Sequence, residues 1–237
     1  MLGTAIIAGP TADVSANAGN KPYNIENVSP DAQLAPSVGD SSSKTSSKAW
    51  HKIDGVCYNG SGKKVEGAIT RGMDISEWQG KINWKEAKKD LDFAFVRISY
   101  GTRHLDDYYD YNMTEAEAAD VPVGTYVYSL AKTNKEALAE AQLAIRQMQG
   151  HKVSYPVAFD LEDEATLGTL TRKEISQIAL TFCDEIRKAG YTPILYMNLN
   201  WYNNFVDWNV LEGSGLDVWI ASYGDTILAP SASKYKY

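Results

Sequence analysis

Tyr155-Pro-Val-Ala-Phe-Asp160-Leu-Glu162 is the stretch that best indicates the architecture of this chain. Its apolar run ends in two carboxylates, Asp160 and Glu162, which are two positions apart. On a β-strand this spacing puts both acids on the same face, with their Cα atoms about 6.6 Å apart. We therefore expect a buried strand that brings two acids to one site.

Two carboxylates this close do not both ionise readily, so one can keep its proton near neutral pH while the other stays charged. Cleavage of a glycosidic bond uses this combination, because it needs a proton for the departing oxygen and a negative charge near an oxocarbenium-like centre. The same pattern also fits acids that cap the next helix, or that bind a metal such as Ca²⁺. The pair alone leaves these alternatives open.

Composition narrows the classes of function. The 237 residues suffice for one barrel or two small domains, and one large domain with a tail is the simpler expectation. The net charge of −7 and the absence of a Lys/Arg cluster exclude nucleic acid as a partner. No apolar stretch approaches the ~20 residues that span a bilayer, so no integral membrane segment is expected. Six tryptophans and fifteen tyrosines would suit a glycan, which is held by ring stacking and hydrogen bonds.

The first part of the chain predicts export. Residues 2–8 are apolar and residues 16–18 read Ala-Asn-Ala, so residues 1–18 are interpreted as a partial signal peptide without its basic start. Residues 19–67 are interpreted as a low-complexity tail or linker, disordered at its start, in which order begins around Trp50. Residues 68–237 then form the main domain. Cys57 and Cys183 are expected to be free thiols.

Strand and helix patterns alternate along the main domain. Thr133 and Glu136 form one capping box, and Thr171 and Glu174 form a second, each at the start of a helix with one apolar face. A repeated βα order predicts parallel strands with helices outside them. The expected strands are residues 69–76, 93–100, 121–130, 155–162, 192–198 and 218–223.

A barrel is favoured over an open nucleotide-binding sheet. The latter needs a glycine-rich turn after its first strand, whereas Asp74 is followed by Ile-Ser-Glu-Trp-Gln-Gly. Barrel active sites lie at the C-terminal ends of the strands. Several polar residues map to such ends and predict a concave acidic site: Asp74, Tyr128, Asp160, Glu162, Asn198 and Tyr223.

Other residues near these ends have less certain roles. Arg97 lies inside a strand and is expected to be a structural ion-pair partner, because buried arginines are usually paired. Trp78 and Gln79 follow the first strand, and a role in the cleft and a role in loop packing are equally open for them. His104 and His151 have no spacing to acids or cysteines that indicates a metal, and neither a metal nor a cofactor is expected.

Several motifs together resemble glycoside hydrolase family 25, the N-acetylmuramidase lysozymes. The resemblance covers residues 68–223 in unbroken order. Its motifs are Gly72-Met-Asp74-Ile-Ser76-Glu-Trp-Gln79-Gly80-Lys-Ile-Asn-Trp84, Phe95-Val-Arg97-Ile-Ser99-Tyr-Gly101, Tyr109-x-x-Asn112, Val123-Gly124-x-Tyr126-x-Tyr128, Asp160-x-Glu162 and Trp219-Ile-Ala-x-Tyr223.

The resemblance implies an irregular TIM-like (β/α) barrel, and a secreted, monomeric enzyme that acts at the cell wall on peptidoglycan glycan strands. The bond implied is the β-1,4 linkage from N-acetylmuramic acid to N-acetylglucosamine. By similarity Glu162 would be the general acid, Asp160 the second catalytic carboxylate and Asp74 a supporting acid. The candidates for substrate contact are Tyr126, Tyr128, Asn198, Trp219 and Tyr223, with Tyr128 preferred to Tyr126 because it lies nearer the end of its strand.

The chain departs from the family pattern in one respect. Family members continue to further strands and another active-site aspartate, whereas this sequence ends at Tyr237, so the barrel is expected to be C-terminally incomplete. A different class of function remains as the alternative, a non-catalytic module that binds peptidoglycan. A chitinase is disfavoured, since the longer acidic run of barrel chitinases is absent upstream of Asp160.

Overall fold

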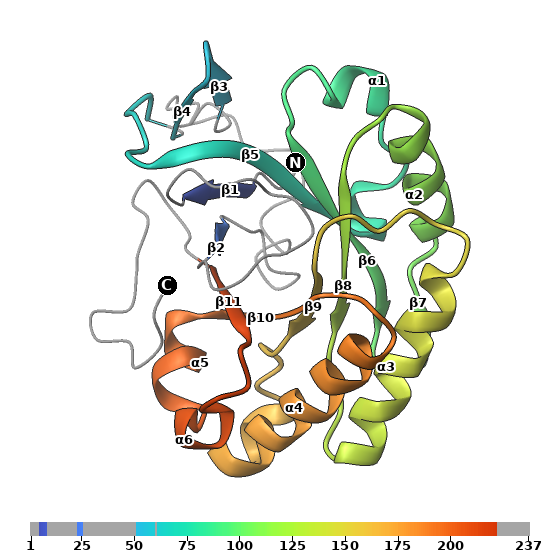
Figure 1. Ribbon diagram of the computed structural model, residues 1–237, viewed down its shortest axis with the longest axis vertical. Helices are drawn as coiled ribbons and strands as arrows, with labels where there is room; N and C mark the ends of the chain where they lie inside the picture. Colours follow the sequence, from blue (N-terminus) through green and yellow to red (C-terminus); the bar gives the residue numbers. More distant parts are fainter. Residues whose placement is uncertain (1–4, 9–22, 26–50, 60, 222–237) are drawn as a thin grey trace, which may run out of the picture.

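The computed structural model describes residues 5–8, 23–25, 51–59 and 61–221. A sheet dominates it, in which strands β1-β5-β6-β8-β9-β10-β11-β2 follow one another. Neighbours from β5 to β11, and β11 with β2, are parallel, and the sheet curls into a half-barrel (Figure 1). The central strands are β5 (Ala68–Ile75), β6 (Phe93–Tyr100), β8 (Val123–Tyr128), β9 (Val157–Asp160), β10 (Pro193–Asn198) and β11 (Asp217–Ala221).

Short strands lie at the margins of this sheet. The strand β1 (Ala5–Ala8) pairs antiparallel with β5, and β2 (Tyr23–Ile25) pairs parallel with β11. Strand β7 (His104–Leu105) turns back antiparallel along β6. A separate hairpin, β3 (His51–Ile53) and β4 (Val56–Tyr58), lies beside β5, and Lys52 ties it to Asp92 through an ion pair of 2.7 Å. The hairpin falls within residues 19–67, the segment expected to be a linker.

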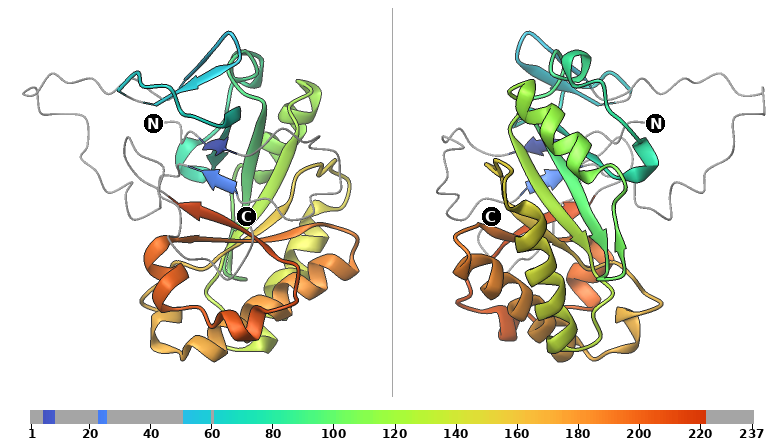
Figure 2. Two further views of the ribbon diagram at one scale, coloured as in Figure 1. Left: turned by 60° about the vertical axis from the view of Figure 1, so that its left-hand side comes forward. Right: turned by 90° about the vertical axis from the view of Figure 1, so that its right-hand side faces the viewer.

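The helices cover the convex side of the sheet, as the two views of Figure 2 show. The capping residues explain where two of them begin: Thr133 accepts a hydrogen bond from the backbone N–H of Glu136, and Thr171 forms a complete capping box with Glu174. The helices are α1 (Trp84–Ala87), α2 (Tyr109–Ala118), α3 (Asn134–Met148), α4 (Arg172–Lys188), α5 (Leu199–Asn204) and α6 (Trp208–Leu211), with the short 3₁₀ helices η2 (Glu77–Gln79) and η3 (Leu167–Thr169).

Strand alternation divides the buried side chains into two layers. The larger layer packs the convex face against the helices, and includes Val127, Phe159 and Phe182. The smaller layer lies on the concave face and is mainly aromatic. Its buried members are Phe93, Phe95, Tyr126, Ala158, Ile194, Tyr196, Trp219 and Ala221.

Two glycines make room for this aromatic layer. A methyl group at Gly72 would overlap the ring of Phe93, and one at Gly124 would lie 2.6 Å from both the ring of Phe95 and the carbonyl oxygen of Pro156. The ring of Phe93 therefore excludes a side chain at Gly72, and the ring of Phe95 together with the Pro156 carbonyl excludes one at Gly124.

The prediction of an α/β, TIM-like barrel fold is confirmed by the parallel βα order and the curled sheet. Both cysteines are free and buried, as expected. Among the described residues, no helix has the length and apolar character that a membrane crossing requires. The predicted signal peptide, residues 1–18, lies mostly outside the described residues.

Candidate active site

Two buried acids lie toward the C-terminal ends of their strands. Asp74 is the second-last residue of β5 and is 4% exposed, and Asp160 is the last residue of β9 and is 2% exposed. Glu162 is half-buried and follows β9 by two residues. The expectation that the strand extends through Glu162 is therefore wrong, since β9 ends at Asp160 and Asp163 begins a turn by accepting the N–H of Thr166. Glu162 lies on the loop above the strand.

Asp160 is affected by the other two carboxyl groups of the site. Burial raises the pKa of Asp160 well above its usual value, and the nearby charges of Glu162 and Asp74 raise it further, while Arg97 opposes them. Burial also raises the pKa of Asp74 well above its usual value. The site thus favours retention of a proton among carboxyl groups that would otherwise ionise well below neutral pH.

Three buried polar atoms on the concave side have no hydrogen-bond partner among the described residues. They are Oδ2 of Asp74, Oδ1 of Asp160 and the indole Nε1 of Trp219. Buried polar groups are normally satisfied, and an unmet one costs about 1–3 kcal/mol. Two acceptors and one donor are therefore available to water or to a polar ligand on this face.

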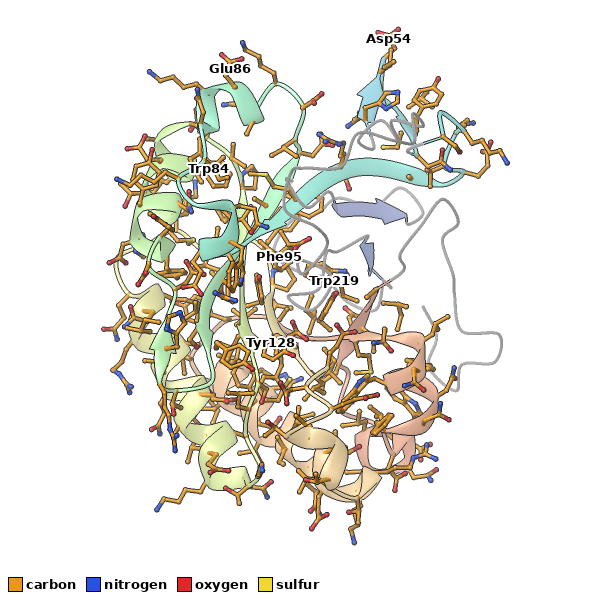
Figure 3. All side chains as sticks on the ribbon, turned by 180° about the vertical axis from the view of Figure 1, so that it is seen from behind. Asp54, Trp84, Glu86, Phe95, Tyr128 and Trp219 are labelled. Atoms are coloured by element: carbon orange, nitrogen blue, oxygen red, sulfur yellow. The ribbon has the colours of Figure 1, made fainter. Side chains whose placement is uncertain are left out.

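Aromatic rings form the wall beside these atoms. The ring of Trp219 lies 4.7 Å from that of Phe95 and meets the ring of Tyr196 edge-on at 4.6 Å, and Figure 3 shows Phe95, Trp219 and Tyr128 within the body of the molecule. Tyr196 is in register with both Asp160 and Trp219, so the three share a face of the sheet. Sequence reasoning named Trp219 but missed Tyr196, although its position two residues before Asn198 at a strand end could have indicated it.

Both predicted tyrosines of β8 occupy the concave side, because they are two residues apart. Tyr128 stacks on Tyr100 at 4.8 Å, and the hydroxyl groups of both rings donate to Oδ2 of Asp163 at 3.3 Å. Tyr126 lies deeper in the aromatic layer, where burial raises its pKa.

Asn198 is at the end of β10, but its side chain accepts the N–H of Trp201 and caps α5. Its predicted contact with substrate therefore competes with a structural role. The predicted residue Tyr223 lies outside the described residues.

Arg97 crosses the concave side as a buried cation, and the expectation of a structural ion pair is confirmed. Its guanidinium is 2.9 Å from a carboxylate oxygen of Glu77 and 3.0 Å from one of Asp106. Asp106 also accepts the backbone N–H of Glu77, which ties η2 to the loop after β7. Arg97 also lowers the pKa of Asp160, so the same cation that pairs with Glu77 and Asp106 acts on the catalytic candidate at the end of β9.

None of the described residues form a group of three or more His, Cys, Asp or Glu side chains arranged to hold a metal ion. The described residues of the site offer carboxyl groups, aromatic rings and buried polar atoms. A curled parallel sheet with buried acids at its C-terminal strand ends and an aromatic concave face is the arrangement of a barrel-type glycoside hydrolase.

The chain belongs to the glycosyl hydrolases family 25, whose family model matches residues 73–236. It is 25% identical over 164 residues to Lysozyme M1 of Streptomyces globisporus, covering 65% of this chain and 55% of that protein. It is also 25% identical over 139 residues to the protein YegX of Escherichia coli K12, covering 56% of this chain and 49% of YegX. The chain thus spans about half the length of the curated relatives that it matches.

Solved structures show the same fold. A family 25 glycosyl hydrolase from Bacillus anthracis superposes with a TM-score of 0.58 at 23% identity, over 70% of this chain and 75% of that one. The bacterial lysozyme of Streptomyces coelicolor gives 0.56 at 23% identity, over 68% and 77% of the two chains.

Proposed function

We propose that this protein is a muramidase that hydrolyses the β-1,4 bond between N-acetylmuramic acid and N-acetylglucosamine in bacterial peptidoglycan. The observation that carries the proposal is the meeting of Asp74, Asp160 and Glu162 at the C-terminal ends of two strands in a family 25 chain. The lysozyme among its relatives supports peptidoglycan as the substrate. Such a substrate implies that the protein acts outside the cell at the wall, and it acts as a monomer.

The unequal burial of the acids divides their roles. Glu162 is the more exposed, on a loop above the sheet, and it is the general acid that protonates the departing glycosidic oxygen. Asp160, enclosed at the end of β9, is the second carboxylate, and its ionised form faces the positive charge that develops on the sugar ring while Glu162 carries the proton. Asp74 is the supporting acid, which raises the pKa of its neighbour and offers an oxygen for a hydrogen bond.

The aromatic wall orients the sugar rings. Tyr128, Tyr126 and Trp219 contact the substrate in this proposal, and the indole N–H of Trp219, which has no partner within the described part of the chain, donates to a sugar or acetamido oxygen. Asn198 at the end of β10 and, from the sequence, Tyr223 complete the predicted set of contacts.

The test is mass spectrometry of soluble products after purified peptidoglycan is incubated with the chain or with Glu162→Gln. The wild type should release fragments that end in reducing N-acetylmuramic acid, and the variant should lose about 10²–10⁴-fold in rate, as expected when a general acid is removed. Equal thermal stability of the two proteins is the control. A wild type that binds the glycan without releasing fragments would replace the proposal with the binding-module alternative.

A further inference from the structure

Trp78 is the most exposed large apolar side chain among the described residues, at 65%. Two others are exposed in that part of the chain, Ile53 at 54% and Leu105 at 44%. A single exposed Leu or Ile is ordinary on a protein surface, whereas a tryptophan ring carries much more apolar area into water. Of the two roles open for Trp78 in the sequence, this exposure favours a role in the cleft over loop packing.

The segment that carries Trp78 is held firmly. Its neighbour Gln79 does the loop packing, because the amide oxygen of Gln79 accepts the backbone N–H of Ser76 at 2.8 Å and its hydroxyl at 3.2 Å. The hydroxyl of Ser76 in turn accepts the N–H of Trp78. On the other side, Glu77 is fixed by its ion pair with Arg97 and by Asp106, which accepts its backbone N–H at 2.7 Å. The backbone of Trp78 is thus held on both sides while its ring stays in water.

A second exposed apolar residue, Leu105, lies near Trp78. We call the two segments that carry these residues, 77–78 and 104–105, the rim of the site. Glu77 contacts His104 at 2.6 Å between Oε2 and Nε2, and the residues next to this pair are Trp78 and Leu105. Both segments follow the C-terminal ends of neighbouring strands, β5 and β6. Two of the three exposed large apolar side chains of the described residues therefore lie at the end of the sheet that carries the acids.

We propose that Trp78 is a platform on which a sugar ring of the glycan strand stacks, at a distance from the bond that is cleaved. Trp78 is four positions after Asp74, so their Cα atoms are at most about 14 Å apart. The inference rests on the proposed function, since only a polymer held at Asp74 and Asp160 would extend to this rim. A platform at Trp78 would make the enzyme prefer long glycan chains to short ones.

The chemistry of the rim favours a sugar over other occupants. The C–H face of a pyranose ring is apolar and its hydroxyl edge is polar, which suits a flat indole bordered by hydrogen-bonding groups. Glu77 and His104 lie beside the platform and can bond to hydroxyl groups at the ring edge. Two separated apolar residues are too small a patch for a stable protein partner, which needs about 800 Å² on each side.

The test compares Trp78→Ala and Trp78→Phe with wild type on two substrates: long glycan strands freed of peptides, and the shortest oligosaccharide of the same repeat that is cleaved. On long strands Trp78→Ala should lower kcat/KM by about twofold to tenfold, mainly through KM, and Trp78→Phe should lose less. The loss should be smaller on the short substrate. Ile53→Ala is the matched control, because it removes an exposed apolar side chain from the β3–β4 hairpin.

Three results would overturn the platform: no change in Trp78→Ala on long strands, an equal loss on both substrates, or self-association of the wild type that Trp78→Ala abolishes. Binding measured in the Glu162→Gln background separates this inference from the proposed function. Cleavage by the wild type that does not depend on Trp78 would leave the muramidase and reject the platform. Glycan binding that depends on Trp78 but is not followed by cleavage would leave the platform and reject the muramidase.

Discussion

Two buried acids lie on opposite sides of the same sheet, and their surroundings differ. Asp160 on the concave side is 2% exposed and has one carboxylate oxygen without a partner among the described residues. Glu140 on α3, behind the sheet, is 1% exposed, but it accepts the hydroxyl of Ser129 at 2.8 Å and the N–H of Leu130 at 2.9 Å. Burial raises the pKa of both, to about 7 for Glu140.

The comparison shows that a raised pKa does not by itself distinguish a reactive acid from a structural one. Glu140 fixes the chain after β8, and Ser129, which it holds, donates its backbone N–H to the carbonyl oxygen of Asp160. The structural acid therefore positions the backbone of the reactive one. What sets Asp160 apart is unused hydrogen-bonding capacity next to other carboxyl groups.

The strongest test of this contrast is Asp160→Asn. We expect glycan cleavage to fall about 10²–10⁴-fold, because the amide cannot supply the negative charge that the reaction needs. Thermal stability should not fall, since the amide has nearly the same shape and removes repulsion from Glu162 and Asp74. Rates on peptidoglycan and melting curves measure both effects. A variant that keeps its activity would show that Asp160 is as structural as Glu140.

A variant of Arg97 tests how much the buried ion pair on the concave side contributes to the stability of the fold. Arg97→Met should cost about 3–5 kcal/mol in the free energy of unfolding, because it leaves the carboxylate of Asp106 buried without its cation. The double variant with Asp106→Asn should recover part of this loss. The pH profile of any remaining activity should move upward, because Arg97 lowers the pKa of Asp160. Urea unfolding of the two variants is the measurement, and a neutral single variant would contradict the ion-pair account.

Glu140→Gln gives the smallest effect and the matched control for Asp160→Asn. The folded-state pKa of Glu140, about 7, lies above its ordinary 4.5, so the folded protein binds the proton more tightly than the unfolded chain does. Its contribution to stability is therefore full below pH 4.5 and falls by up to about 3 kcal/mol as the pH rises past 7.

In Glu140→Gln this loss should be absent, and the variant should gain stability relative to wild type between pH 5 and pH 8. Activity should stay near that of wild type, since the amide of glutamine can still accept the N–H of Leu130 and bond to the hydroxyl of Ser129, so the backbone next to Asp160 keeps its place. Urea unfolding at the two pH values measures the difference. The same slope with pH in both proteins would contradict this role for Glu140.

Particular elements show what the sequence could predict. The capping residues Thr133 and Thr171 and the alternation of strands and helices indicated a parallel sheet, because these signals are local. The placement of Asp74 and Asp160 at strand ends followed from the same pattern. Glu162 was misplaced onto the strand, since strand length depends on the turn that Asp163 makes with Thr166.

Features set by contacts between distant segments could not be predicted. Tyr196 joins the aromatic wall only because the register of β10 aligns it with Asp160 and Trp219. Glu140 looked like any polar residue of an amphipathic helix, although it is buried against the end of β8. Gln79 packs into its loop while Trp78 stays exposed, and this difference depends on the side-chain amide of Gln79, which folds back onto Ser76.

The aromatic layer and its two glycines also constrain how this protein can change. The ring of Phe93 fills the space above Gly72 on the neighbouring strand, and the ring of Phe95 fills the space above Gly124. Neither residue of such a pair can therefore be enlarged alone. At Gly72 the ring of Phe93 must become smaller before the glycine can gain a side chain, and the reverse order passes through an overlap. At Gly124 a smaller Phe95 would not suffice, because the backbone carbonyl oxygen of Pro156 would still lie 2.6 Å from an added methyl group. Substitutions at Gly72 and Phe93 are therefore ordered in time, whereas Gly124 stays a glycine whichever residue stands at position 95.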